Sequence, residues 1–235
     1  MNKLLILCIF LLNLITFSCN NGQTHSHKKV LKVDDFTKSV KFYDKNGLLE
    51  KEGKFLYDTI KTGIWSYYEK GKLKDQIEFI FKDNSEYLNQ IWVYDKNEEL
   101  AGGLYYEISK IKDDYSLGEK ILIEIGTPYK FFSNLDSELF LLYSSKEEFN
   151  VDYSNKNEIK FDTIWNIKKN YPTKFPDEDD YKFYIRFNIV PNKIGTFKAI
   201  GVLTEHASDF VENDSVTKYR EIFLDIKFNV KDTIN

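Results

Sequence analysis

Apolar and polar residues alternate along several runs in the second half of the chain. The clearest run has apolar residues at every second position from Ile222 to Val230, with the polar residues Asp225, Lys227 and Asn229 between them. A period of two with one apolar face is typical of a half-buried antiparallel strand. Similar runs occur at 121–125 and 183–189, and residues that favour turns separate the runs. The pattern predicts roughly six or seven strands in a β-sandwich.

The first half repeats a different pattern, with a period of about 25 residues. Tyr43, Tyr68 and Tyr94 each precede a turn-like segment that begins with Asp or Glu followed by Lys, and a strand-like run follows each segment. Asn and Gly tolerate positive φ, so such segments join antiparallel strands as hairpins. An isolated hairpin is marginally stable in water, and we therefore expect these units to stack.

The best copy of this repeat runs from Gly63 to Leu73 and reads Gly-Ile-Trp-Ser-Tyr-Tyr-Glu-Lys-Gly-Lys-Leu. It resembles the MORN-type repeat, in the variant found in bacterial YwqK-like proteins. The third copy has Gln90 and Glu98 where the best copy has glycines. The resemblance covers roughly a third of the chain and implies a scaffold of hairpins without a catalytic constellation. Many proteins of this kind are described as antitoxin-like.

The segment 183–205 resembles Ig-like or fibronectin-like modules of cell-envelope proteins. The chain lacks the Cys…Trp…Cys core of antibody domains, so an antibody-type domain is not implied. We predict an all-β protein with MORN-like hairpin repeats at 36–112 and an Ig-like β-sandwich at 113–235. The polar stretch 109–117 is the predicted linker.

The N-terminus reads as a secretory signal peptide. A basic start precedes an apolar run from Leu4 to Phe17, and Ser18 and Cys19 follow that run. This ending resembles the lipobox of bacterial lipoproteins, which implies removal of residues 1–18 and lipidation of Cys19. Residues 19–35 are then predicted to be a flexible tether. An ordinary secretory signal peptide is the alternative, whereas the apolar run is too short for a transmembrane helix.

Lipidation would attach the protein to the bacterial cell envelope through its N-terminal lipid, with the outer membrane favoured over the inner one. Cys8 and Cys19 are the two cysteines, so a mature chain that begins at a lipidated Cys19 has no free thiol. Disulfides, thiolate catalysis and Cys-ligated metals are then excluded. The net charge of −4 is spread along the chain and forms no basic face, which argues against a nucleic-acid partner.

The motifs of common active sites are missing from the sequence. It contains no phosphate-binding glycine loop, nucleophile elbow or His-Glu-x-x-His motif. His25 and His27 lie in the tether, and His206 follows Glu205 without an evident third partner. The acidic run 177–180 lacks calcium-loop spacing and is interpreted as solvated. We therefore predict no enzymatic activity, cofactor or metal, although a glycosidase-like carboxylate pair stays open.

Aromatic residues gather near the repeat turns and are candidates for binding. They are Trp65, Tyr67, Tyr68, Trp92 and Tyr94. The favoured interpretation is a shared core of stacked hairpins, and the alternative is an exposed surface for sugars or a protein. The sequence thus predicts a membrane-anchored, non-catalytic binding or scaffold module. The alternatives are an antitoxin- or immunity-like protein with one tight protein partner and a glycan-binding surface lipoprotein.

Overall fold

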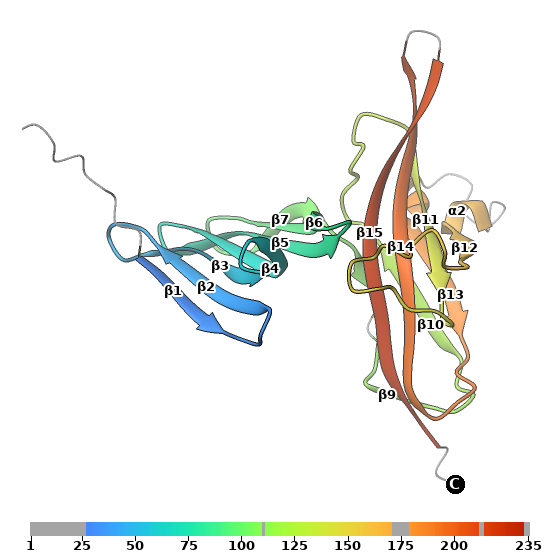
Figure 1. Ribbon diagram of the computed structural model, residues 1–235. Helices are drawn as coiled ribbons and strands as arrows, with labels where there is room; N and C mark the ends of the chain where they lie inside the picture. Colours follow the sequence, from blue (N-terminus) through green and yellow to red (C-terminus); the bar gives the residue numbers. More distant parts are fainter. Residues whose placement is uncertain (1–26, 110, 171–178, 212–213, 233–235) are drawn as a thin grey trace, which may run out of the picture.

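The protein is all-β, as predicted, and its strands form three sheets in two units (Figure 1). The structure is a computed structural model that describes residues 27–109, 111–170, 179–211 and 214–232. The predicted signal peptide and Cys19 lie outside the described residues. No helix within the described ranges is long and apolar enough to cross a membrane.

The first unit is a seven-stranded sheet in which every strand pairs antiparallel with the next one along the chain. Its strands are β1 (His27–Lys32), β2 (Thr37–Tyr43), β3 (Leu49–Leu56), β4 (Ile60–Glu69), β5 (Lys72–Lys82), β6 (Ser85–Tyr94) and β7 (Leu100–Leu104). This is the predicted array of stacked hairpins. Membership of the MORN-type family stays a prediction.

The repeated turns have the same geometry in the first and third copies. In the first, the Asp44 carboxylate accepts the backbone N–H groups of Asn46 and Leu48, both at 2.8 Å. In the third, Asp95 accepts the corresponding groups two and four residues later, at 2.8 and 3.0 Å. Glu98 adopts φ of 64° where the first copy has Gly47 at 80°. The aspartate thus holds the turn even where glycine is missing.

A small core stabilises the first sheet around Trp65. The Trp65 ring lies over Gly53 in the neighbouring strand, where an added Cβ would come within 2.3 Å of it. The indole N–H donates to the Lys54 carbonyl at 3.0 Å, and the ring packs against Phe55. Trp65 is therefore a core residue, in agreement with the favoured interpretation of the repeat aromatics.

The tether prediction is wrong for residues 27–32. These residues form β1, which pairs with β2 along its whole length. The segment is polar, and from Lys28 onward its side chains are exposed, so it lacks the apolar alternation that marks a half-buried strand. Backbone pairing, together with the Lys28 ammonium group 5.4 Å from the centre of the Phe42 ring, accounts for its order.

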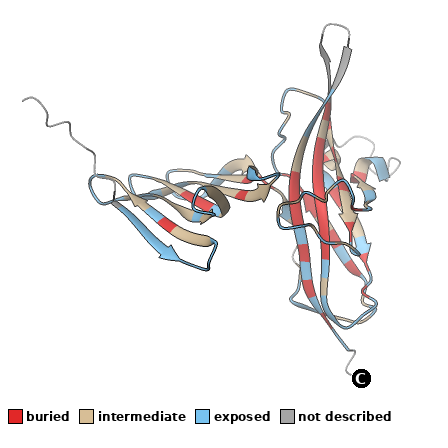
Figure 2. Ribbon diagram, viewed as in Figure 1, coloured by how far each residue is buried: buried red, intermediate tan, exposed pale blue. Residues whose placement is uncertain are grey.

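The second unit is an Ig-like sandwich of two sheets. Its elements are β8 (Glu107–Ile108), β9 (Asp114–Ser116), β10 (Ile121–Gly126), β11 (Ser137–Ser144), β12 (Asp162–Trp165), α2 (Ile167–Asn170), η1 (Asp179–Phe183), β13 (Tyr184–Ile189), β14 (Gly195–Val211) and β15 (Asp214–Lys231). One sheet has the order β13-β10-β8 and the other β12-β11-β14-β15-β9. Consecutive strands β10 and β11 lie in different sheets, as in Ig-type Greek keys. Most of the buried residues lie between these sheets (Figure 2).

The boundary between the units lies earlier than predicted. β8 already pairs with β10, and β9 pairs in parallel with the end of β15. The first sheet ends at Leu104, so the chain passes from one unit to the other at Tyr105 and Tyr106. The polar stretch 109–117 looked like a linker because β8 and β9 are short edge strands, and such strands need little apolar sequence.

Candidate binding surface

Four aromatic rings from four neighbouring strands form a cluster on the outer face of the five-stranded sheet. Phe140 of β11 pairs with Trp165 of β12, and His206 of β14 pairs with Tyr219 of β15. The Phe140 ring centre lies 5.3 Å from that of Trp165 and 5.5 Å from that of His206. His206 stacks on Tyr219 at 6.4 Å. We call these four residues the outer-face cluster.

The outer-face cluster exists because alternate residues of each strand point to opposite sides of the sheet. Leu139 and Leu141 of β11 are buried between the sheets, so Phe140 between them points outward. The side chain of Tyr219 is 62% exposed, and those of Phe140, Trp165 and His206 are partly buried. The cluster therefore offers aromatic surface to a ligand without being part of the core.

Charged and amide groups border the cluster and fix its position. Glu138 accepts a hydrogen bond from the buried Asn166 amide at 2.7 Å, and its Oε1 lies 3.2 Å from Nε2 of His206. The Lys169 ammonium group lies 3.2 Å from the centre of the Trp165 ring and 3.7 Å from Glu138. One face of Trp165 is thus covered by a cation.

The Glu205–His206 pair considered in the sequence does not form. Glu205 points into the sandwich, where it accepts the backbone N–H groups of Phe131 and Phe132 and the Ser137 hydroxyl at 2.7–3.0 Å. His206 points outward into the cluster. Adjacent residues of a strand face opposite sides, so this separation follows from the strand itself. Glu205 organises a loop and His206 belongs to the surface.

The aromatic residues predicted as binding candidates lie in the first sheet and do not join the outer-face cluster. Trp65 is core, and the hydroxyl groups of Tyr68 and Tyr94 donate to Glu52 and Gln76 at 2.7 and 2.6 Å. Tyr67 lies beside Trp65, with ring centres 6.4 Å apart. Trp92 stacks on Tyr105 at 6.0 Å. These rings hold the sheet together, although all except Trp65 are partly exposed.

The two units are joined where the part of β6 that is not paired with β7 meets the part of β15 that is not paired with β9. Asn89 of β6 is buried, and its side-chain amide accepts the Phe223 N–H at 2.8 Å and donates to the Phe223 carbonyl at 2.9 Å. In return, Arg220 of β15 donates to the Leu88 and Asn89 carbonyls of β6 at 3.1 and 2.6 Å. Each strand thus satisfies the unpaired backbone groups of the other. We call this arrangement the edge clasp.

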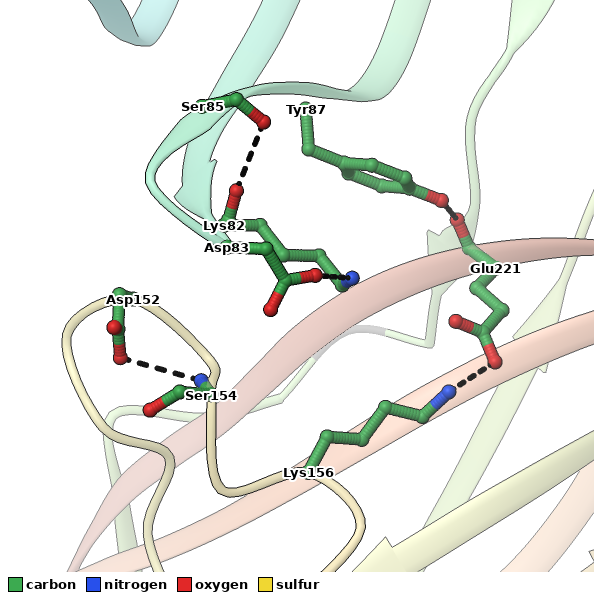
Figure 3. A network of polar contacts seen from close by, with 8 residues as sticks. All are labelled: Lys82, Asp83, Ser85, Tyr87, Asp152, Ser154, Lys156 and Glu221. Carbon is green, nitrogen blue, oxygen red and sulfur yellow. Dashed lines mark hydrogen bonds and ion pairs between the residues drawn. The ribbon is translucent and has the colours of Figure 1, made fainter.

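Further contacts surround the edge clasp (Figure 3). The Tyr87 hydroxyl donates to the Glu221 carbonyl at 2.8 Å, and Lys156 forms an ion pair with the Glu221 carboxylate. The Asp83 N–H in the β5–β6 turn donates to the Asp152 carbonyl at 3.2 Å. The loop that follows β11 therefore contacts both units. Burial raises the pKa of Tyr106 and of Tyr153 beside this junction to about 12.

A large open cleft lies elsewhere in the sandwich and has a volume of about 920 Å³. Its lining includes Tyr143, Pro191 and Lys198, and Lys198 forms an ion pair with Glu148 at 3.5 Å. The charged groups that line it are of both signs, so they do not define a ligand.

The remaining candidates for chemistry lie at the limits of the described chain. His25 falls outside it, and only the backbone of His27 is described. The acidic run 177–180 is described for the backbone of its last two residues alone. In the part of the chain that the structure describes, no three His, Cys, Asp or Glu side chains gather as metal ligands.

Comparisons with protein-family models, with curated proteins and with solved structures gave no match for this chain. The surfaces of the molecule itself are therefore the guide to its function.

The sequence reasoning missed most of the outer-face cluster. His206 was considered with the wrong neighbour, and Phe140, Trp165 and Tyr219 were not singled out. The available signal was Trp165, which is one of three tryptophans and directly precedes the polar Asn166. β12 has only four residues, which are too few to show an alternation of apolar and polar positions, so the sequence does not place that tryptophan on a strand.

Proposed function

We propose that the protein is a lipid-anchored lipoprotein of the bacterial cell envelope that acts as a non-catalytic binding module. The outer-face cluster is its contact surface for a protein partner, and this cluster is the observation that carries the proposal. Tryptophan and tyrosine are enriched among the residues that dominate binding energy in protein interfaces. Here they lie together on one flat sheet face, with the charged groups of Glu138 and Lys169 beside them.

The first sheet serves as a spacer between membrane and binding unit. Its strands follow one another in order from β1, which is nearest in sequence to Cys19, to β6 and β7 beside the sandwich. Neighbouring strands lie about 4.8 Å apart, so six spacings carry the sandwich roughly 29 Å from β1. The edge clasp keeps the sandwich from rotating freely about the connection at Tyr105 and Tyr106.

A protein partner fits the cluster better than a glycan does. Sugars stack on the open faces of aromatic rings, but the Lys169 ammonium group covers one face of Trp165. One face of Tyr219 is likewise taken by His206. The second face of the exposed Tyr219 ring, the ring edges and the neighbouring charged groups remain available, and a protein surface can contact all of them. An immunity-like role is a specific form of this proposal, in which the partner is one tightly bound toxin.

The test is a quantitative pull-down with the mature chain from residue 19, carrying Cys19→Ser in place of the lipidated residue, from detergent-solubilised envelope. We expect one stoichiometric protein partner, and we expect Tyr219→Ala to reduce its recovery at least tenfold. Tyr184→Ala is the matched control, because Tyr184 is also an exposed tyrosine but lies on the three-stranded sheet.

Equal loss with both variants, or no loss with either, would remove the cluster from the proposal. Binding to purified envelope glycans in place of a protein would favour the glycan alternative. Lipidation is tested separately, by incorporation of labelled palmitate into the wild-type protein and its absence from Cys19→Ser.

A further inference from the structure

The first edge of the spacer sheet exposes an unusual number of apolar side chains. Val30, Leu31, Val33 and Phe36 lie in β1 and in the turn after it, and they are 53%, 71%, 50% and 62% exposed. Residues 28–36 are all exposed, and we call them the β1 surface. Val30 and Leu31 point to opposite faces of the sheet, so the exposed apolar side chains line both sides of this edge, and exposed apolar groups gathered in this way mark an interaction site. None of these residues belongs to the repeat copies, the first of which begins at Tyr43.

Basic residues accompany these apolar side chains. The ammonium groups of Lys28 and Lys29 lie 5.4 and 5.3 Å from the centres of the Phe42 and Tyr43 rings. Lys32 pairs with Asp35 at 2.7 Å, and Asp34 accepts the backbone N–H of Phe36 at 2.8 Å. The two aspartates are thus engaged within the turn, whereas Lys28 and Lys29 border the edge as cations. Apolar side chains between lysines suit an anionic lipid surface.

The position of the β1 surface in the chain supports the same ligand. Eight residue steps separate Cys19 from His27, so β1 begins at most roughly 29 Å from the anchor, at about 3.6 Å per step. In the sheet, β1 is the edge strand opposite the edge that meets the sandwich (Figure 1). Contact of β1 with a membrane therefore leaves the outer-face cluster clear.

A second copy of the chain is a less suitable ligand for the β1 surface than a membrane is. Antiparallel pairing of two β1 strands would bring Lys28, Lys29 and Lys32 of one copy close to those of the other. Like charges on paired strands are destabilising, and lysines on edge strands are a common device against such pairing.

We propose that the β1 surface docks onto the anionic membrane that carries the lipid anchor. Leu31, Val33 and Phe36 insert at the boundary between headgroups and acyl chains, and Lys28 and Lys29 contact anionic headgroups. The unpaired backbone groups of β1 stay in the hydrated headgroup layer, because they would lack partners in hydrocarbon. This inference rests on the proposed lipid anchoring and adds a second, protein-mediated contact that orients the spacer.

The test uses the mature chain from residue 19 with Cys19→Ser, so that membrane binding is independent of the acyl chains. This chain has no cysteine, and a single Leu31→Cys carries an environment-sensitive fluorophore. Val151→Cys is the matched control, since Val151 is 84% exposed on the sandwich. Vesicles contain phosphatidylcholine with or without 30% phosphatidylglycerol. We expect a blue shift for the label at 31 and none for the label at 151, with anionic vesicles only.

The contribution of charge is measured with Lys28→Gln/Lys29→Gln. We expect partitioning onto anionic vesicles to fall about 25-fold, because each of the two lysines near an anionic surface contributes roughly fivefold. The control pair Lys146→Gln/Lys193→Gln removes the same charge from the sandwich and should leave partitioning within twofold.

Equal blue shifts at 31 and 151, equal effects of the two lysine pairs, or no partitioning would overturn the proposal. A dimer in sedimentation that Leu31→Asp converts to monomer would overturn it in favour of self-association. The tests of palmitate incorporation and of partner capture do not depend on these outcomes. A failure of membrane docking is therefore distinguishable from a failure of the proposed function.

Discussion

The edge clasp predicts that Asn89, although far from any proposed ligand, contributes strongly to stability. Asn89→Ala removes both hydrogen bonds to the Phe223 backbone and the bond to Glu78 at 2.7 Å. The N–H and carbonyl of the buried Phe223 then lose their partners, at about 1–3 kcal/mol each. We expect a total loss of about 3 kcal/mol, a large part of the 5–15 kcal/mol typical of folded proteins. Urea unfolding followed by circular dichroism should show the midpoint falling by roughly 1–2 M.

Two further variants separate hydrogen bonding from packing. Asn97→Ala removes an exposed turn asparagine and should cost less than about 0.5 kcal/mol. Asn89→Asp keeps the shape of the side chain but places an oxygen against Glu78 and the Phe223 carbonyl, so it should cost at least as much as Asn89→Ala. If Asn89→Asp were neutral, or if Asn89→Ala matched Asn97→Ala, the clasp would not hold the units together.

Three other predictions concern the clasp, the core of the first sheet and a buried tyrosine. Arg220→Lys should cost about 2 kcal/mol in urea unfolding, because one ammonium group cannot replace both the Nη2 bonds to the two β6 carbonyls and the Nη1 bonds to the Tyr87 hydroxyl and the Glu221 carbonyl; Lys227→Ala, an exposed control, should be neutral. Gly53→Ala should lower the free energy of unfolding by about 3 kcal/mol, since its Cβ would overlap the Trp65 ring, and an unchanged melting temperature would refute that packing. Tyr106 has its pKa raised to about 12, so wild-type stability should fall as the pH rises from about 10 to 12, when the unfolded state loses the proton first. Tyr106→Phe should remove up to about 2 kcal/mol of that decline in alkaline thermal melts, and identical pH profiles would contradict it.

The parts of the fold that the sequence predicts are those in which a local rule and the tertiary structure agree. The run from Ile222 to Val230 alternates because one side of β15 faces the opposite sheet of the sandwich. The turns after Tyr43 and Tyr94 can be predicted because the carboxylates of Asp44 and Asp95 accept hydrogen bonds from backbone N–H groups of the same turn. In both cases neighbouring residues carry the whole signal, so no distant contact is needed to read it.

The features that escaped prediction depend on contacts between distant residues. β1 is ordered by pairing with β2, although its own sequence looks like a tether. Arg220 is one of two arginines among 33 basic residues. Amino-acid composition alone does not indicate what this rare residue does in the structure. Its role is visible only once β6 and β15 meet, 131 residues apart in the contact with Asn89. The outer-face cluster likewise needs four strands to be assembled before its rings come together.

In the first sheet, each strand pairs only with the strands next to it in the sequence. The width of this sheet can therefore change by whole hairpins. Each hairpin adds two strands, or about 10 Å of reach, and contacts only the strands on either side. The edge clasp uses β6, near the far end, so a hairpin inserted between β2 and β4 would leave both the β1 surface and the clasp unchanged. Under the proposed lipid anchoring, each added hairpin would hold the proposed binding face about 10 Å farther from the membrane.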